Sequence, residues 1–455
     1  MFTKKQTNIL KGIAVLLLLI HHSWAPLKTE TMPVYGEAIK TMTSMGKLSV
    51  AIFAILSGYG MFKSAEKKDR SVWEGVLAHI LKVYTVFWLT GGLLAALVSA
   101  SNGGLSVLYG RMPVYHLLLD LLALSPIART PMLANSWWYV NAALLYYCFF
   151  PFLYGGIAKL KKGNYILWLL SAMWLMLHPG TNTILVYGIF FVMGMILAER
   201  DLPSRLLALC DRYFVADLLL FPLIGGLAGS LYVRQTFLSG LKAEYYLDWL
   251  PALFVILITA ILTASIPDRF PGPLELTGSL SFEIFLIHGA FIKYAPHLVY
   301  PDDICGLVLL RLYGLSLAGA LVIRLVTRLG RLERLPAFLA GSRAGRRFLG
   351  PALALLIVCM TAPGMIANLG IGEIELYPRQ AVMEVGDWYA PVYTKTTFLW
   401  DFAVPKYTSS NPSIAYMEDG VIYAQSPGKA KFTVSTAGGT FGSIQVIVKD
   451  PEEAP

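Results

Sequence analysis

The chain carries little charge for its length. Only 14% of its 455 residues are Asp, Glu, Lys or Arg, whereas 56% are hydrophobic. A soluble domain usually has nearly twice that charged fraction, so the composition excludes an ordinary water-soluble globular protein. The apolar residues also come in blocks of about 20, the length at which a helix crosses a bilayer. The sequence therefore predicts a multi-pass membrane protein, with the lipid bilayer as its first partner.

Cysteine is scarce, and no residue pattern has the spacing of a metal site. Cys148, Cys210, Cys305 and Cys359 lie in or beside apolar blocks, where cysteine usually serves as a small packing residue. We therefore expect no metal ion and no permanently bound cofactor. The net charge of +9 does not indicate a nucleic-acid partner, because the basic residues occupy short loops between apolar blocks. Basic loops of this kind are typical of the cytoplasmic side of membrane proteins.

The apolar blocks predict about eleven membrane spans and an orientation. The basic loops, the longest of them 327–348, are expected in the cytoplasm together with the N-terminus, and an odd number of spans places the C-terminus outside. A shorter stretch, 114–128, is predicted to be an interfacial or re-entrant helix on the outer side. Its His116 and Asp120, one helical turn apart, are interpreted as a water-facing polar stripe, with a catalytic pair as the alternative. The predicted spans are 8–25, 45–63, 76–100, 134–156, 164–178, 182–198, 213–233, 246–266, 276–295, 305–326 and 349–369.

After residue 370 the sequence changes from apolar blocks to short alternating segments separated by Gly, Pro and Asn-Pro. The period-two patterns "KAKFTV" and "SIQVIV" indicate strands with one buried face. We expect a small antiparallel β-sandwich carried on the outer face. The predicted domains are a membrane domain at 1–348, a final helix and linker at 349–370, the β-sandwich at 371–450 and a tail at 451–455.

Histidines occur at membrane depth in two predicted spans that run in the same direction. His21 and His22 end the first apolar block, and His288 lies in the outer half of a later block, with Glu283 deeper. Ionisable groups at this depth are costly and therefore indicate function, although imidazoles at a membrane interface are also common. Both spans would deliver histidine to one level, where a neutral imidazole can act as a general base.

Six motifs follow one another in an order that resembles acyltransferase family three, the bacterial multi-pass membrane O-acyltransferases. The first has a basic residue, an alanine three positions on and a histidine eleven positions on; the family usually has arginine where Lys11 and Lys82 stand. "FVMGMILAER" is similar to the family's Gly-Met segment. The other matching residues are Lys11, Ala14 and His22; Ser57, Gly58 and Tyr59; Lys82; Trp137, Trp138 and Tyr139; and Ser281, Phe282 and His288.

The resemblance implies an all-α polytopic bundle in the bacterial cytoplasmic membrane that moves an acyl group, usually acetyl, from cytosolic acyl-CoA to a hydroxyl of a sugar or other acceptor at the outer face. It assigns His22 as general base, with His288 and His21 as further catalytic candidates, and leaves an acyl-histidine intermediate open. A helix separates Lys11 from His22 by about 16 Å, within reach of a pantetheine arm. Cofactor-binding candidates are Lys11, Lys82, Ser57 and Gly58, the last two being alternatively a helix-packing site; substrate-binding candidates are Trp137, Trp138, Tyr139, Glu283 and Ser281.

The β region resembles group-two bacterial immunoglobulin-like domains, through Ser409 to Pro412, Gly420 and Gly428. Such domains mostly act as spacers or adhesive modules, so a cell-surface partner is possible, and no His, Asp and Ser cluster suggests a hydrolase there. Two other functions stay open. A transporter or flippase of a surface glycan or lipid fits the multi-pass organisation, although no paired broken helices stand out. A non-catalytic display scaffold would need only one anchor.

Overall fold

The structure is a computed structural model of the chain. Its contacts form two compact units, Met1–Ser101 with Leu133–Leu349 and Asn102–Met132 with Gly350–Pro455. The predicted last span, 349–369, and the tail, 451–455, lie outside the described residues. The described residues are 2–24, 36–67, 71–102, 104–109, 112–128, 130–160, 163–177, 183–213, 216–238, 244–264, 272–300, 305–334, 336, 339, 342, 372–377, 380–389, 392–397, 406–418, 421–435 and 441–450.

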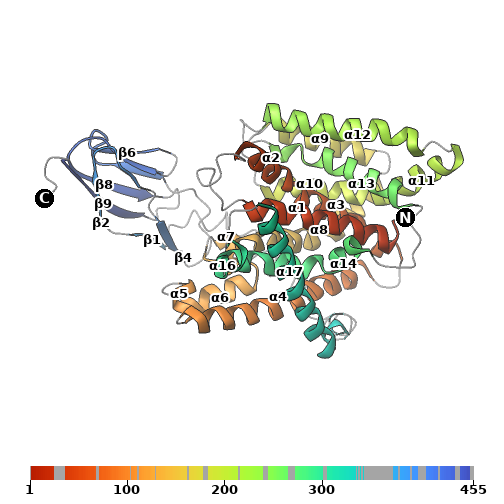
Figure 1. Cartoon of the computed structure of the whole chain (residues 1–455), viewed down its shortest axis with the longest axis horizontal. Helices are drawn as coiled ribbons and strands as arrows, with labels where there is room; N and C mark the ends of the chain where they lie inside the picture. Colours follow the sequence, from red (N-terminus) through yellow and green to blue (C-terminus); the bar gives the residue numbers. More distant parts are fainter. Residues whose placement is uncertain are drawn as a thin grey trace. The chain divides into compact units, whose positions relative to one another are not determined.

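The first unit is helical (Figure 1). Its element order follows the apolar blocks of the sequence, with short 3-10 or π turns where those blocks are interrupted. The elements are α1 (Lys4–Trp24), α2 (Gly36–Gly46), α3 (Leu48–Glu66), α4 (Val72–Asn102), η1 (Asn135–Trp137), α8 (Trp138–Leu160), α9 (Asn164–Leu177), α10 (Thr183–Glu199), α11 (Leu202–Tyr213), α12 (Ala216–Val233), η3 (Arg234–Leu238), η5 (Glu244–Tyr246), α13 (Trp249–Thr263), α14 (Pro273–Ser279), α15 (Ser281–Tyr294), α16 (Pro296–Val299), α17 (Cys305–Leu329) and η6 (Leu332–Arg334).

Six of the described helices are long and apolar enough to cross a membrane, or up to eight if each of two bent pairs is one span. The predicted count of about eleven is not confirmed. The helices at two of the predicted spans, α9 and α13, have 14 and 15 described residues. At 1.5 Å per residue such helices cover only about 21–23 Å, less than the roughly 30 Å hydrocarbon layer.

Glycines let α1 cross α14 at backbone contact. A Cβ atom added to Gly12 would overlap the carbonyl of Leu274, and one added to Gly278 would overlap the carbonyl of Asn8. Small residues permit this kind of approach between membrane helices. The first helix is therefore packed directly against the helix that leads into α15, where His288 lies.

The second bent pair places a sharp break just before the helix with His288. The axes of α14 and α15 differ by 82° at Leu280. Polar groups around the break are satisfied by α17: the hydroxyls of Thr277 and Tyr313 lie 2.8 Å apart, and Arg324 donates to the carbonyl of Ser279 at 2.7 Å. Broken backbone at membrane depth is tolerated where protein groups replace the lost helical bonds.

The second unit contains three short helices, α5 (Leu105–Tyr109), α6 (Pro113–Leu121) and α7 (Ser125–Ala128). The expected water-facing stripe is wrong for Asp120, which is 1% exposed and accepts a hydrogen bond of 2.9 Å from the Tyr109 hydroxyl. His116 is also bound, because its Nδ1 lies 2.6 Å from the Tyr109 carbonyl. Tyr109 thus holds both residues of the predicted pair, which the sequence pattern could not indicate.

The second unit also contains two β-sheets (Figure 1). One has the order β4-β1-β9-β8-β5 with β2 paired to β9, and the other has the order β3-β7-β6. An all-antiparallel arrangement is wrong, because β1 and β2 run parallel to β9. The strands are β1 (Gly372–Tyr377), β2 (Gln380–Glu384), β3 (Trp388–Tyr389), β4 (Val392–Thr397), β5 (Lys406–Ser409), β6 (Ala415–Glu418), β7 (Val421–Ala424), β8 (Gly428–Ser435) and β9 (Phe441–Lys449).

The predicted alternation of the two patterned strands is confirmed. In β8 the side chains of Ala430, Phe432 and Val434 are buried, and in β9 those of Ile444, Val446 and Val448 are buried. Alternate residues of a strand point to opposite faces, so these six side chains form one apolar face. A small β domain is therefore present, while its immunoglobulin-like type stays a prediction.

Candidate active site

Two histidines from distant parts of the sequence lie against each other. The ring centroids of His22, in the last turn of α1, and His288, on α15, are 5.0 Å apart, with their planes inclined by 49°. The two helices pack together. This is the meeting of histidines that the parallel direction of the two predicted spans favours, although their catalytic role stays a prediction.

The two rings differ in their surroundings. His288 is 0% exposed, and its Nδ1 lies 2.8 Å from the carbonyl oxygen of Phe285 and 3.2 Å from that of Ile284. A carbonyl only accepts, so the neutral ring carries its proton on Nδ1 and its lone pair on Nε2. Nε2 has no hydrogen-bond partner within the described part of the chain. His22, by contrast, is only half-buried and can meet a bound molecule.

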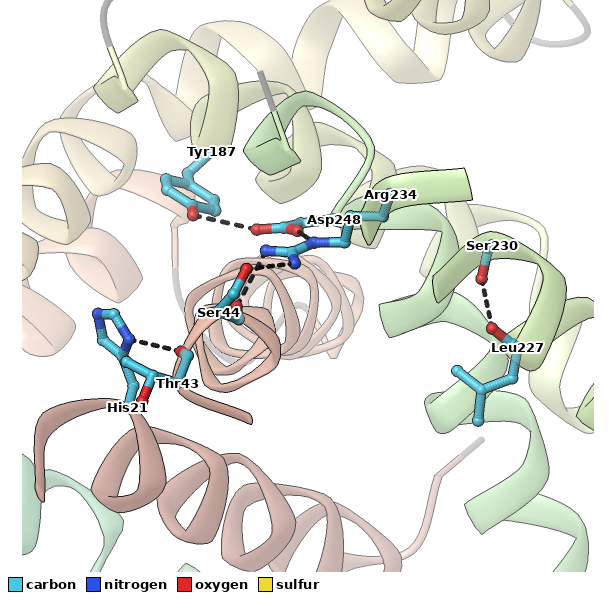
Figure 2. A network of polar contacts seen from close by, with 8 residues as sticks. All are labelled: His21, Thr43, Ser44, Tyr187, Leu227, Ser230, Arg234 and Asp248. Carbon is cyan, nitrogen blue, oxygen red and sulfur yellow. Dashed lines mark hydrogen bonds and ion pairs between the residues drawn. The ribbon is translucent and has the colours of Figure 1, made fainter. Parts of the chain in front are cut away.

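His21 is held by a different part of the molecule. Its Nδ1 lies 2.8 Å from the carbonyl oxygen of Thr43, near the end of α2 (Figure 2). Its ring centroid is 4.8 Å from that of His22, edge to face. Adjacent helical residues point about 100° apart, and the two rings contact different parts of the molecule.

A buried ion pair lies next to this contact. The Nε of Arg234 donates to Asp248 Oδ1 at 2.6 Å, and both side chains are at most 1% exposed (Figure 2). The guanidinium also donates to the Oγ and the carbonyl of Ser44, at 2.9 and 3.0 Å. Tyr187 contributes a longer bond of 3.4 Å to Asp248. The network thus fixes Ser44 near the end of α2. Thr43, the residue directly before Ser44, binds His21.

Sequence reasoning missed this ion pair, although a signal was present. Asp248 lies inside the predicted span 246–266, and Arg234 directly follows the predicted span 213–233. Ionisable residues at such positions indicate function or a paired partner by default. The π-helical turn at 234–238, which contains the arginine, has no comparable signal in the sequence.

A second group of charges lies around Lys11, eleven residues before His22 on α1. Lys11 interacts electrostatically with Lys82 of α4 and with Glu283 of α15. Glu283 itself is bound to Arg324 of α17, with Nε and Oε1 2.6 Å apart, which identifies the partner that the sequence left open. Neither lysine has an ion-pair partner among the residues that the structure describes. Two cations therefore lie near each other without a bound carboxylate of their own.

A cavity of about 240 Å³ lies between the end of α3 and the start of α4. Its polar lining includes Ser64, Lys67, Ser71 and His79. His79, which lines the cavity, also interacts electrostatically with Lys82 and Lys11. The sequence analysis did not single out His79, which lies one helical turn before Lys82.

The aromatic residues predicted to bind substrate differ in their contacts: one packs between helices, and the other two lie in a series of ring contacts that leads to His288. Trp137 is 1% exposed and donates from Nε1 to the carbonyl of Leu286 at 2.9 Å, which anchors η1 to α15. Tyr139 has its ring centroid 6.2 Å from that of Phe285, which in turn is 6.1 Å from His288. Trp138 is half-buried and lies next to Tyr139, at 5.8 Å. Tyr139 is thus linked through Phe285 to His288, and Trp138 contacts Tyr139.

The remaining predicted residues lie in helix contacts. A Cβ added to Gly58 would overlap the carbonyl of Phe191 on α10, which favours the packing alternative for this glycine. Ser57 interacts with the side chains of Tyr139 and Tyr147. Ser281 is buried in the first turn of α15, directly after the break. Binding roles for these residues stay predictions.

One tyrosine outside the membrane-spanning segments supports the end of α1. The hydroxyl of Tyr300 donates to the carbonyl of Ser23 at 2.9 Å. Burial raises the pKa of Tyr300 to about 12, because the phenolate would lose hydration. The hydroxyl therefore remains a donor throughout the neutral range, next to His22.

Comparison with known proteins gives one match. Residues 5–327 match the family described as "Acyltransferase domain". No curated protein and no solved structure matches the chain. The matched range contains both histidine-bearing helices, the two lysines and Arg324, and it ends before the β-strands.

Proposed function

The chain belongs to acyltransferase family 3, and from that premise we propose that it is a membrane O-acyltransferase that uses cytosolic acyl-CoA, with acetyl as the first acyl group to test. The acceptor is a hydroxyl of a glycan or lipid at the outer face of the bacterial cytoplasmic membrane. One observation carries the proposal: α1 carries Lys11, which has no ion-pair partner in the described residues, and, eleven residues further on in its last turn, the half-buried His22.

The donor binds through its phosphates. Lys11 and Lys82 attract phosphate oxygens as point charges, and the nucleotide part enters the cavity lined by Lys67 and His79, which interacts electrostatically with both lysines. The pantetheine arm then follows α1 for the roughly 16 Å that separate Lys11 from His22. The thioester reaches the histidines while the phosphates stay at the cytoplasmic end.

The transfer itself uses His22 as general base. As the acceptor oxygen forms a bond to the thioester carbonyl carbon, His22 takes the hydroxyl proton. When the carbon–sulfur bond breaks, the proton passes from His22 to the leaving thiolate. The products are the O-acyl ester and the free thiol of CoA, and the histidine returns to its neutral form.

The test measures CoA release and acyl transfer with acetyl-, butyryl- and octanoyl-CoA, each radiolabelled in the acyl group, in membranes that contain the protein. We expect His22→Ala to lower turnover at least about a hundredfold, since a positioned base contributes about 10²–10⁴-fold. Lys11→Ala is expected to raise the KM for acyl-CoA more than it lowers kcat. Lys429→Ala, an exposed cation of the β region, is the matched control.

Clear outcomes would contradict the proposal. Normal turnover by His22→Ala together with loss in His21→Ala would transfer the role to the neighbouring ring. Normal turnover by both would remove the histidine mechanism. Label that stays on the protein after acetyl-CoA alone would indicate an acyl-histidine intermediate. Movement of a glycan or lipid without CoA release would favour the transporter.

A further inference from the structure

The Nε2 atom of His288 is a buried hydrogen-bond acceptor without a donor in the described residues. Buried polar atoms are mostly hydrogen-bonded, and each exception in a folded protein needs an explanation. Nε2 of His288 is such an atom within the described residues, in a side chain that is 0% exposed. Since Nδ1 is already committed to the carbonyl of Phe285, the ring can neither turn away nor exchange its tautomer without losing that bond.

Of the two rings that contact His288, only one can donate a hydrogen bond to its Nε2. Among the described residues, the aromatic contacts of His288 are with Phe285 and His22. Phenylalanine has no N–H, whereas each tautomer of His22 has one. The two ring centroids are 5.0 Å apart, and no hydrogen bond joins the rings in this arrangement. Rotation of the half-buried His22 ring would bring one of its nitrogens within hydrogen-bond distance of His288 Nε2. Catalytic hydrogen bonds are often long before substrate binds.

We infer that His288 is a positioning residue for His22: its Nε2 accepts a ring N–H of His22 and thereby directs the other nitrogen of His22 at the acceptor hydroxyl. This inference rests on the proposed function. The backbone carbonyl of Phe285 fixes the tautomer of His288, and His288 in turn fixes that of His22. When His22 takes the hydroxyl proton, its second N–H stays bound to a neutral acceptor, which stabilises the imidazolium.

A different assignment makes the inference testable. If His288 itself took the proton, it would be the base and His22 the accessory ring. Glutamine separates the two roles, because its side-chain oxygen accepts a hydrogen bond but takes up no proton near neutral pH. Phenylalanine keeps most of the volume of the ring and removes the acceptor. Asparagine keeps the acceptor on a shorter side chain.

The experiment compares His288→Gln, His288→Phe and His288→Asn with His22→Ala, in the intact chain, using the acyl-CoA that the wild type turns over fastest. We expect His288→Phe to lower kcat about 10–100-fold with an unchanged KM for acyl-CoA. His288→Gln is expected to stay within about tenfold of wild type, and His288→Asn to fall below it. His297→Gln, at an exposed histidine of α16, is the matched control.

The outcomes separate this inference from the function on which it rests. A His288→Phe variant at wild-type rate overturns the inference alone, and so does a His288→Gln variant as inactive as His22→Ala, which would make His288 the base. Activity in His22→Ala overturns the proposed function. Insertion and acyl-CoA binding are measured for each variant; if His288→Phe does not insert, the order of Gln above Asn decides the question.

Discussion

Replacing Asp248 by alanine should lower the free energy of unfolding of the membrane unit far more than an average substitution does. The change leaves the guanidinium of Arg234 wholly buried without its carboxylate, at a position that is 0% exposed. The two bonds to Ser44 remain, so the loss is the charge partner, the 2.6 Å bond and the longer bond from Tyr187 to Asp248. Removing one partner of a buried ion pair costs about 3–5 kcal/mol, because the remaining charge stays desolvated.

Two further variants separate the contributions of the charge and of the hydrogen bond to that loss of stability. Asp248→Asn keeps an acceptor for Arg234 but removes the negative charge, and a hydrogen bond to a charged group is worth about 1.5–3 kcal/mol, so an intermediate loss is expected. The double variant Arg234→Met with Asp248→Leu removes both charges. Apolar replacement of a complete buried pair is often neutral, so the double variant should recover most of the stability lost by Asp248→Ala.

The assay is unfolding by SDS in mixed micelles, followed by tryptophan fluorescence, with insertion checked beforehand. A loss below about 1 kcal/mol for Asp248→Ala would refute the reasoning, since it would mean that water reaches Arg234. A double variant as unstable as the single one would also refute it, because the uncompensated charge would then not be the cause. Turnover of the folded variants tests whether the network also orients His21.

Three further outcomes are expected. Gly278→Ala should push α1 away from α14, because the new methyl group meets the carbonyl of Asn8, and should lower stability and turnover together; Gly225→Ala, at an open helical position, should leave both nearly unchanged. In alkaline unfolding titrations the folded-state pKa of Tyr300 is about 12 and the ordinary value is 10, so the unfolded state loses its proton first; stability should fall as pH rises through 10, and less so in Tyr300→Phe. A cysteine at exposed Thr408 should react with an impermeant thiol reagent on whole cells, whereas labelling only after lysis would contradict the outward position of the β domain.

The sequence predicted helices and strands well where periodicity decides the structure. Residues 8–24 of the first apolar block lie in α1, and the alternation around Phe432 became a buried strand face. It predicted the span count less well, because a count by composition cannot see where a helix ends early, as in α9, or breaks, as at Leu280. The parallel pairing of β2 with β9 depends on contacts between distant segments, which a single sequence does not contain.

The sequence proposed members of a candidate site but not their connections. The resemblance to the family's first-helix motif indicated Lys11 and His22, and direction along the membrane indicated His288; their roles stay predictions. The partner of Glu283 and the ion pair between Arg234 and Asp248 were not predicted, since pairing between side chains is a property of the packed helices. An intramembrane charge signals that a partner exists, but the identity of that partner requires the fold.

The close crossing of α1 and α14 has a consequence for how the protein is made. Gly12 must meet the backbone near Leu274, and at about 5–20 residues per second the ribosome needs roughly 13–50 s to synthesise the intervening 260 or so residues. During that time α1 is in the membrane without α14, against which it packs, and His22 has not yet met His288. The first helix to be inserted is therefore among the last to be packed, and the proposed catalytic pair of histidines comes together only once biosynthesis of the helical unit is nearly complete.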